Sequence, residues 1–178
     1  MKYIYYLRWV IPVLLIGWAL QQALIAGDVL VSETDFRVRT PIIDVMLPAS
    51  RVEAREQGVV LLSDPVYIDV TLPPRANAVT LELDVSAQSE TLKLGVQQGP
   101  NFDIVFPDVM ISDQAKFKRY SLRTSTFPHL EAGYKLRFMI SAPNLTAGNI
   151  TVLHARTIIE RKPFSFAWLR AAIKGQNL

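Results

Sequence analysis

The chain has 178 residues, half of them apolar, with no cysteine and a formal net charge of +3. Its basic residues are scattered or lie near the two ends, so the stripe of positive charge that nucleic acids require is missing and we predict no nucleic-acid partner. The lack of cysteine argues mildly against a eukaryotic secreted protein, because such domains usually carry disulfides.

The N-terminal stretch is long and apolar. Residues 9–26 contain no charged side chain, and as a helix they would extend about 27 Å, close to the hydrocarbon thickness of a bilayer. Aromatic side chains gather at its start, as they do at a membrane interface: Tyr3, Tyr5, Tyr6 and Trp9. We therefore predict that residues 1–27 form a transmembrane anchor in contact with membrane lipid.

The charges on either side of this stretch predict its orientation. Lys2 and Arg8 precede it, whereas acidic residues follow it. The positive-inside rule then places the N-terminus in the cytoplasm, and the chain becomes a single-pass protein of the cytoplasmic (inner) membrane with its C-terminal domain outside. A cleaved signal peptide is the alternative. Signal peptidase sites carry a small residue three positions before the cut, however, and for a cut after Ala26 that position is Leu24, which is not small. A buried helix of a soluble domain is a third possibility.

Small and polar residues in the predicted span indicate helix packing. Ala19, Ala23 and Gly27 recur every four residues, a spacing that lets two helices approach closely. Gln22 is a polar amide at membrane depth, where an unpaired amide is costly. These residues predict a protein partner or a homo-oligomer formed through the helix. The alternative is that the glutamines lie at the outer interface and meet water or lipid headgroups.

The residues that follow have the period of β-strands. Apolar and polar side chains alternate in residues 66–72, 79–85 and 134–140, which is typical of half-buried antiparallel strands. Weaker strand candidates lie at residues 36–40, 58–63, 91–96, 102–106, 118–122 and 149–159.

Turn signals such as Asp64-Pro65 and Gly99-Pro100 separate these segments at the spacing of a sandwich. We predict an all-β fold, an antiparallel β-sandwich of jelly-roll type, with its core in residues 58–160. A small closed barrel is the alternative. Residues 28–57 are expected to form a stalk with an edge strand.

The C-terminal residues 161–178 leave the strand pattern and predict a short amphipathic helix between Pro163 and Gly175. Its aromatic and basic side chains are typical of a helix that lies in a membrane interface: Phe164, Trp168, Arg170 and Lys174. The same helix could instead contact a partner or dock on the sandwich.

Residues for catalysis are scarce. The two histidines, His129 and His154, stand apart in the sequence, and no phosphate-binding loop, zinc motif or nucleophile motif occurs. Asp103, Asp108 and Asp113 recur every five residues, which favours solvated turn aspartates over a calcium site. We predict that the chain is not an enzyme and holds no cofactor or metal ion.

Residues 130–159, "LEAGYKLRFMISAPNLTAGNITVLHARTII", place a glycine turn before a strand, then a short loop and a second strand. This segment resembles the closing strands of carbohydrate-binding modules and galactose-binding-like jelly rolls. The resemblance implies a non-catalytic jelly roll that often binds glycans. All three tryptophans lie outside the predicted sandwich, so Tyr67, opposite a clear apolar face, is the candidate for stacking on a sugar.

These observations favour a non-enzymatic, single-pass membrane protein that displays a β-sandwich and acts as an accessory or structural subunit of a cell-envelope complex. A membrane-tethered glycan-binding module is the alternative hypothesis. An envelope enzyme is a weaker one, because the motifs supply no nucleophile and base.

Overall fold

The structure is a computed structural model, and it describes residues 9–18, 27–86, 92–98, 103–125, 135–143, 145 and 149–163. The chain divides into two compact units. One is Val29–Arg161, and the other combines Met1–Asp28 with Lys162–Leu178.

Residues 9–18 are α-helical. Over the residues that the structure describes, no helix is long and apolar enough to cross a membrane. The prediction of a single-pass protein of the cytoplasmic membrane is therefore wrong: apolarity extends over the whole predicted span, but the described helix does not. Residues 19–26 lie outside the described part.

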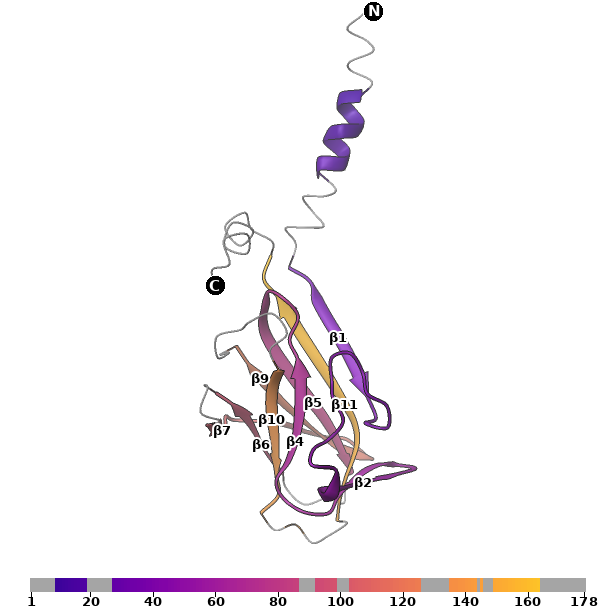
Figure 1. Ribbon diagram of the computed structural model, residues 1–178, viewed down its shortest axis with the longest axis vertical. Helices are drawn as coiled ribbons and strands as arrows, with labels where there is room; N and C mark the ends of the chain where they lie inside the picture. The colour runs from indigo at the N-terminus through magenta and orange to yellow at the C-terminus, as the bar shows by residue number, and fades with distance from the viewer. Residues whose placement is uncertain are drawn as a thin grey trace, which may run out of the picture. The chain divides into compact units, whose positions relative to one another are not determined.

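The unit Val29–Arg161 is an antiparallel β-sandwich, which confirms the predicted all-β sandwich (Figure 1). In the larger sheet the order is β2-β3-β11-β5-β9-β8, and β1 also pairs with β11. Its strands are β1 (Val29–Thr34), β2 (Val52–Arg55), β3 (Gly58–Leu61), β5 (Ala76–Ser86), β8 (Met110–Asp113), β9 (Phe117–Thr124) and β11 (Ile150–Arg161). In the smaller sheet the order is β4-β10-β6-β7, with β4 (Val66–Thr71), β6 (Lys93–Gln97), β7 (Ile104–Val105) and β10 (Lys135–Ser141). A single 3₁₀ turn, η1 (Ala49–Arg51), precedes β2 in the described chain.

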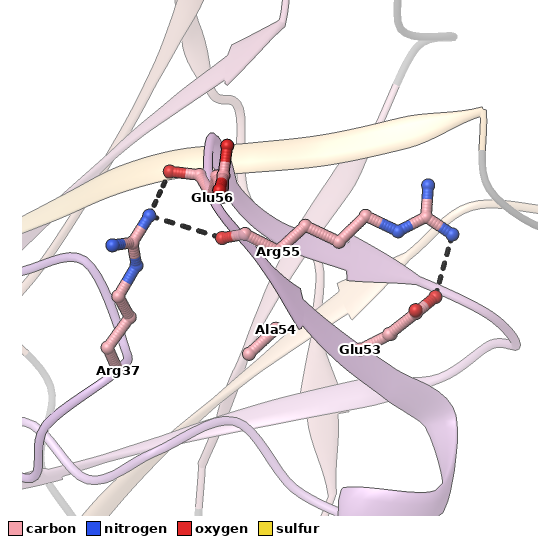
Figure 2. A pocket seen from close by; sticks show the side chains of 5 residues that line it. All are labelled: Arg37, Glu53, Ala54, Arg55 and Glu56. Atoms are coloured by element: carbon pink, nitrogen blue, oxygen red, sulfur yellow. Dashed lines mark hydrogen bonds and ion pairs between the residues drawn. The ribbon is translucent and has the colours of Figure 1, made fainter.

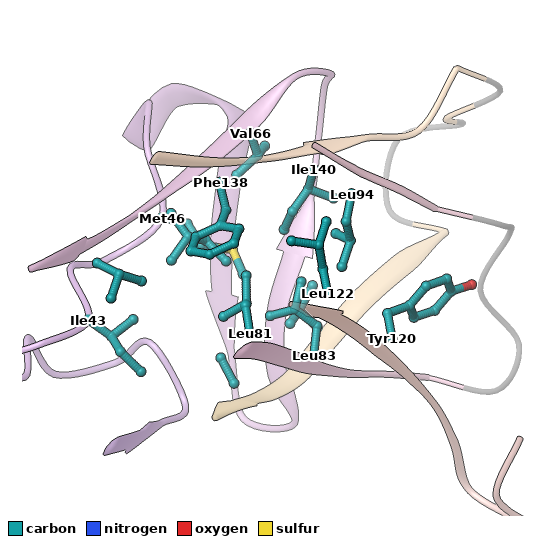
Figure 3. Packing of buried hydrophobic residues seen from close by; sticks show 14 of the residues in the cluster. Ile43, Met46, Val66, Leu81, Leu83, Leu94, Tyr120, Leu122, Phe138 and Ile140 are labelled. Carbon is teal, nitrogen blue, oxygen red and sulfur yellow. The ribbon is translucent and has the colours of Figure 1, made fainter. Parts of the chain in front are cut away.

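The hydrophobic core lies between the two sheets, because alternate residues of each strand point inward. Phe138 and Ile140 of β10 face Leu81 and Leu83 of β5, and all four are at most 1% exposed (Figure 3). Tyr120 of β9 is buried beside them, and its hydroxyl accepts a hydrogen bond from the backbone N–H of Leu92 at 3.4 Å. The exposed faces of both sheets are therefore free to carry polar residues.

One predicted strand is wrong. Residues 36–40 bend instead of extending, and Phe36 has a φ of 63°, which no strand residue adopts. The strands near this region are β1 and, further along the chain, β2. Both lie at edges of the larger sheet, within the stretch expected to form a stalk with an edge strand. The alternation rule missed β1 because its outward residues Val29 and Val31 are apolar as well.

Residues 40–47, which we call the edge segment, cover the free edge of β4. Leu47 and Tyr67 exchange two backbone hydrogen bonds of 2.9 and 2.7 Å, and the Asp44 N–H donates to the Asp69 carbonyl at 2.9 Å. Ile43 of this segment is fully buried. A covered edge cannot pair with another chain, so β4 is held in place for the residues on its outer face.

Candidate functional site

The outer face of the smaller sheet gathers side chains from β4, β10 and β6, and we call it the Tyr67 face. Core residues occupy the even positions of β4 and β10, so the side chains at the odd positions lie on the outer face. The register pairs Tyr67 with Met139 and Asp69 with Arg137. Met139 also pairs with Gly95 of β6. These pairs form two adjacent rows across the sheet, one apolar and one charged.

The apolar row continues beyond Gly95. A Cβ at Gly95 would lie 2.6 Å from Cγ2 of Ile104 and 3.1–3.2 Å from two ring atoms of Phe106. The Phe106 ring therefore lies over the bare backbone of Gly95, where a side chain would overlap Ile104 and press on the ring. Phe106 keeps 46% of its surface exposed. Tyr67, Met139 and Phe106 thus present aromatic and thioether surface to solvent along one line.

The charged row consists of a bidentate ion pair. Nε and Nη2 of Arg137 donate to the two carboxylate oxygens of Asp69 at 2.7 and 2.8 Å. Asp69 is buried, and its carboxylate raises the pKa of Arg137, which burial of the guanidinium opposes. The guanidinium carbon of Arg137 also lies 5.4 Å from the centre of the Tyr67 ring. Asp69 therefore orients Arg137, and Arg137 in turn orients the tyrosine ring.

A second charged cluster lies at the end of the same face, where the edge segment meets β10. Asp44 accepts hydrogen bonds from Nε of Arg39 at 2.6 Å and from Nζ of Lys135 at 2.5 Å. The hydrogen bond from Lys135 lowers the pKa of Asp44, against the opposing effect of burial, and Arg39 lowers it further. Asp44 is thus an anion at neutral pH, held between two cations.

A hollow of ≈ 570 Å³ opens beside the β2–β3 hairpin and is lined by Arg37 and by residues 53–56 (Figure 2). Nη2 of Arg37 donates to the backbone carbonyls of Arg55, at 3.2 Å, and of Glu56. Arg55 in turn forms an ion pair with Glu53 at 2.7 Å. Arg37 thus ties the bend at residues 36–38 to the hairpin turn, and Glu53 and Arg55 are paired with each other, so these polar groups already serve the fold. We therefore place the candidate site on the Tyr67 face.

Most sequence-predicted site residues fall outside the described part of the chain: Tyr3, Tyr5, Tyr6, Ala19, Gln22, Ala23, Phe164, Trp168, Arg170 and Lys174. Trp9 and Gly27 are described and exposed. Their predicted roles in helix packing and at a membrane interface stay predictions. Tyr67 lies on the outer face of β4, half-buried, and its proposed role in stacking also stays a prediction.

Sequence reasoning missed the neighbours of Tyr67. The alternation in β10 placed Arg137 and Met139 on one face, but only the register of β4 against β10 brings them to Tyr67. Phe106 belongs to the predicted strand candidate 102–106, of which the structure forms β7 at Ile104–Val105, but the sequence did not show that this segment lies against Gly95. A usable signal was the isolated Gly95 inside a strand pattern, which indicates close approach of another chain segment.

The side chains that could bind a metal ion do not gather within the described residues. Among these residues, no three side chains of His, Cys, Asp and Glu lie together in a way that could hold a metal ion. Asp103 and Asp108 are exposed, and Asp113 pairs in register with Lys118. His154 lies 3.8 Å from the Glu33 carboxylate on the outer face of the larger sheet, and His129 is outside the described residues. That the chain is not an enzyme stays a prediction.

No protein-family model and no curated protein matches the chain. Two solved structures are similar in fold. The xylan-binding module CBM15 has 16% identity and a TM-score of 0.46, over 76% of this chain and 99% of that chain. TmCBM27, a carbohydrate-binding module that recognises mannan, has 12% identity and a TM-score of 0.41, over 74% of this chain and 98% of that chain. Both belong to the class that residues 130–159 resemble. At TM-scores this low the likeness supports no argument about ligand or mechanism.

Proposed function

We propose that the chain binds a glycan on the Tyr67 face. The observation that carries this proposal is the row of half-buried Tyr67, half-buried Met139 and exposed Phe106 beside the Arg137–Asp69 ion pair. A sugar ring offers C–H groups on its faces and hydroxyl groups at its edge. Aromatic surface suits the faces, and a planar charged side chain suits the hydroxyls.

The arrangement is rigid, which favours binding. Tyr67 and Arg137 lie on paired strands, and the edge segment covers the free edge of β4. Arg137 is fixed by two hydrogen bonds to a buried carboxylate. A face whose side chains are ordered before the ligand arrives loses little conformational entropy on binding.

The interpretation as a subunit of a membrane complex depended on the predicted anchor. Because the described residues contain no helix that could span a membrane, that interpretation has lost its main support. Glycan binding does not depend on the anchor.

Substitutions on the Tyr67 face test the proposal. We expect Tyr67→Ala and Phe106→Ala each to weaken glycan binding about tenfold or more, because each removes aromatic surface from the centre of the face. Tyr67→Phe should retain most of the affinity if stacking is its main role. A glycan array first identifies the glycans that bind. Affinity electrophoresis then measures binding in gels that contain polysaccharides with those glycans.

Met110→Ala is the matched control. Met110 is 74% exposed but lies on β8 of the other sheet, so its loss removes similar apolar surface without touching the Tyr67 face. If Met110→Ala weakens binding as much as Phe106→Ala does, or if no glycan binds the full chain, the proposal fails.

A further inference from the structure

We infer that the glycan is acidic, and that one of its anionic groups binds between Lys135 and Arg39. This inference rests on the proposed glycan binding and adds to it the charge of the ligand. A uronate carboxylate and a sulfate ester share the required chemistry, which is a compact anion with several acceptor oxygens.

The first support is an excess of positive charge. Asp44 is one carboxylate with two cationic partners, Arg39 and Lys135, so the cluster has a formal charge of +1. The neighbouring charged pair on this face, Asp69 with Arg137, has no net charge, because among the described ion pairs Asp69 pairs with Arg137 alone. The Asp44 side chain is only 9% exposed, whereas those of Lys135 and Arg39 are 49% and 69% exposed. The negative charge is therefore covered while the positive charge faces solvent.

The second support is the donor geometry. Asp44 uses Nε of Arg39, and a guanidinium carries four more N–H donors on its two Nη atoms. Asp44 also accepts from Nζ of Lys135, and an ammonium group has three donors. Because both cations are held by the same buried carboxylate, they are positioned together before a ligand binds. An anion that bridges them would also relieve their mutual repulsion.

The third support is position. Lys135 points outward from the same face of β10 as Arg137 and Met139, and it lies opposite Thr71 at the end of β4. Four residues of strand separate Lys135 from Met139, which is about 13 Å. The cationic cluster and the aromatic row are therefore close enough to contact one oligosaccharide, with its sugar rings on the row and its anionic group at the cluster.

The test compares polymers that differ only in charge. Full-chain protein is run in affinity gels that contain polygalacturonate or the same polymer after carboxyl reduction, and in a second pair a sulfated galactan or its desulfated form. We expect at least one anionic polymer to bind about tenfold more tightly than its neutral counterpart. This preference should decrease as salt concentration rises.

Charge-removing variants locate the effect. The double variant Arg39→Gln with Lys135→Gln should lose the preference for the anionic polymer while keeping the affinity for the neutral one. Lys116→Gln is the control, because it removes an exposed cation from the turn between β8 and β9 of the other sheet. Circular dichroism of each variant checks that the fold is intact.

The outcomes separate the two proposals. Equal affinity for charged and neutral polymers in the unmodified chain, with binding that still depends on Tyr67, overturns the inference and leaves the proposed function standing. A preference that survives the double variant also overturns it. If neither polymer of either pair binds and the glycan array is blank, the proposed function falls and the inference falls with it.

Discussion

Two buried threonines in neighbouring strands differ in whether the hydroxyl is satisfied. Thr34 of β1 is 7% exposed, and its Oγ1 accepts the backbone N–H of Phe36 at 2.9 Å. Thr157 of β11 is fully buried, and within the described part of the chain its Oγ1 has no hydrogen-bond partner. A buried hydroxyl without a hydrogen-bond partner destabilises the folded state. The Thr34 hydroxyl instead accepts a hydrogen bond from a backbone N–H that would otherwise have no acceptor.

The same substitution should therefore have opposite effects at the two sites. We expect Thr157→Val to raise the free energy of unfolding by about 1 kcal/mol, because the methyl group replaces an unsatisfied hydroxyl of similar size. Thr34→Val should lower it by about 1 kcal/mol, since the Phe36 N–H then lacks its acceptor. Urea denaturation measures both. Equal destabilisation by the two variants would show that the Thr157 hydroxyl finds a partner in solution.

At the scale of elements, two glycines allow close packing for different reasons. Gly58 begins β3 with a φ of 142°, and a Cβ there would lie 2.3 Å from the backbone oxygen of Val152 in β11. The contact occurs next to the register shift of β11 between Val152 and His154. Gly95 instead leaves space for the side chains of Ile104 and Phe106. A backbone atom cannot move aside without breaking strand pairs, but a side chain can rotate.

We predict that Gly58→Ala lowers the free energy of unfolding by about 3 kcal/mol or more, through strain at positive φ and a clash with β11. Gly95→Ala should cost only about 1 kcal/mol but should weaken glycan binding, because the added methyl group overlaps Ile104 and presses on the Phe106 ring. Thermal unfolding measures the stability of the Gly58→Ala and Gly95→Ala variants, and affinity electrophoresis measures their glycan binding. Unchanged binding in Gly95→Ala would show that Phe106 does not need to lie over the sheet.

At the scale of the whole molecule, Asp44 connects the edge segment to β10 through its bond to Lys135. Its pKa lies below its ordinary value of 3.8 in the folded state. A carboxyl group whose pKa is depressed by folding stabilises the protein above that ordinary value, and this contribution disappears as the pH falls through the folded pKa. The sandwich should therefore lose part of its stability in acid.

The variant Asp44→Asn tests this pH dependence. We expect it to be less stable than the unmodified chain at pH 7, and the difference in free energy of unfolding to shrink below about pH 4 as Asp44 becomes protonated. Asp108→Asn, at an exposed position, is the control. A difference that stays constant from pH 7 to pH 3 would show that the Asp44 charge contributes nothing to the fold.

By itself the sequence determined the fold class. Period-two alternation in residues 66–72, 79–85 and 134–140 predicted β4, β5 and β10, because a strand with one buried face must alternate. It also identified Tyr67 as an outward aromatic residue opposite an apolar face. It failed where that signal was absent, as in the short strands β2 and β8 and at the bend around Phe36. Apolarity at the N-terminus likewise predicted a membrane span, but no helix among the described residues is long and apolar enough to cross a membrane.

Only the tertiary structure decided which side chains surround Tyr67. Arg137 and Asp69 are 68 residues apart in the chain, and they meet because β10 pairs with β4 in one particular register. A slip of β10 by one residue would have turned Arg137 toward the core and away from Asp69. Asp44 joins Lys135 because the edge segment pairs with β4, and Phe106 lies over Gly95 because β7 pairs with β6. Alternation shows which way a side chain points, but its neighbours depend on contacts between segments that are distant in the sequence.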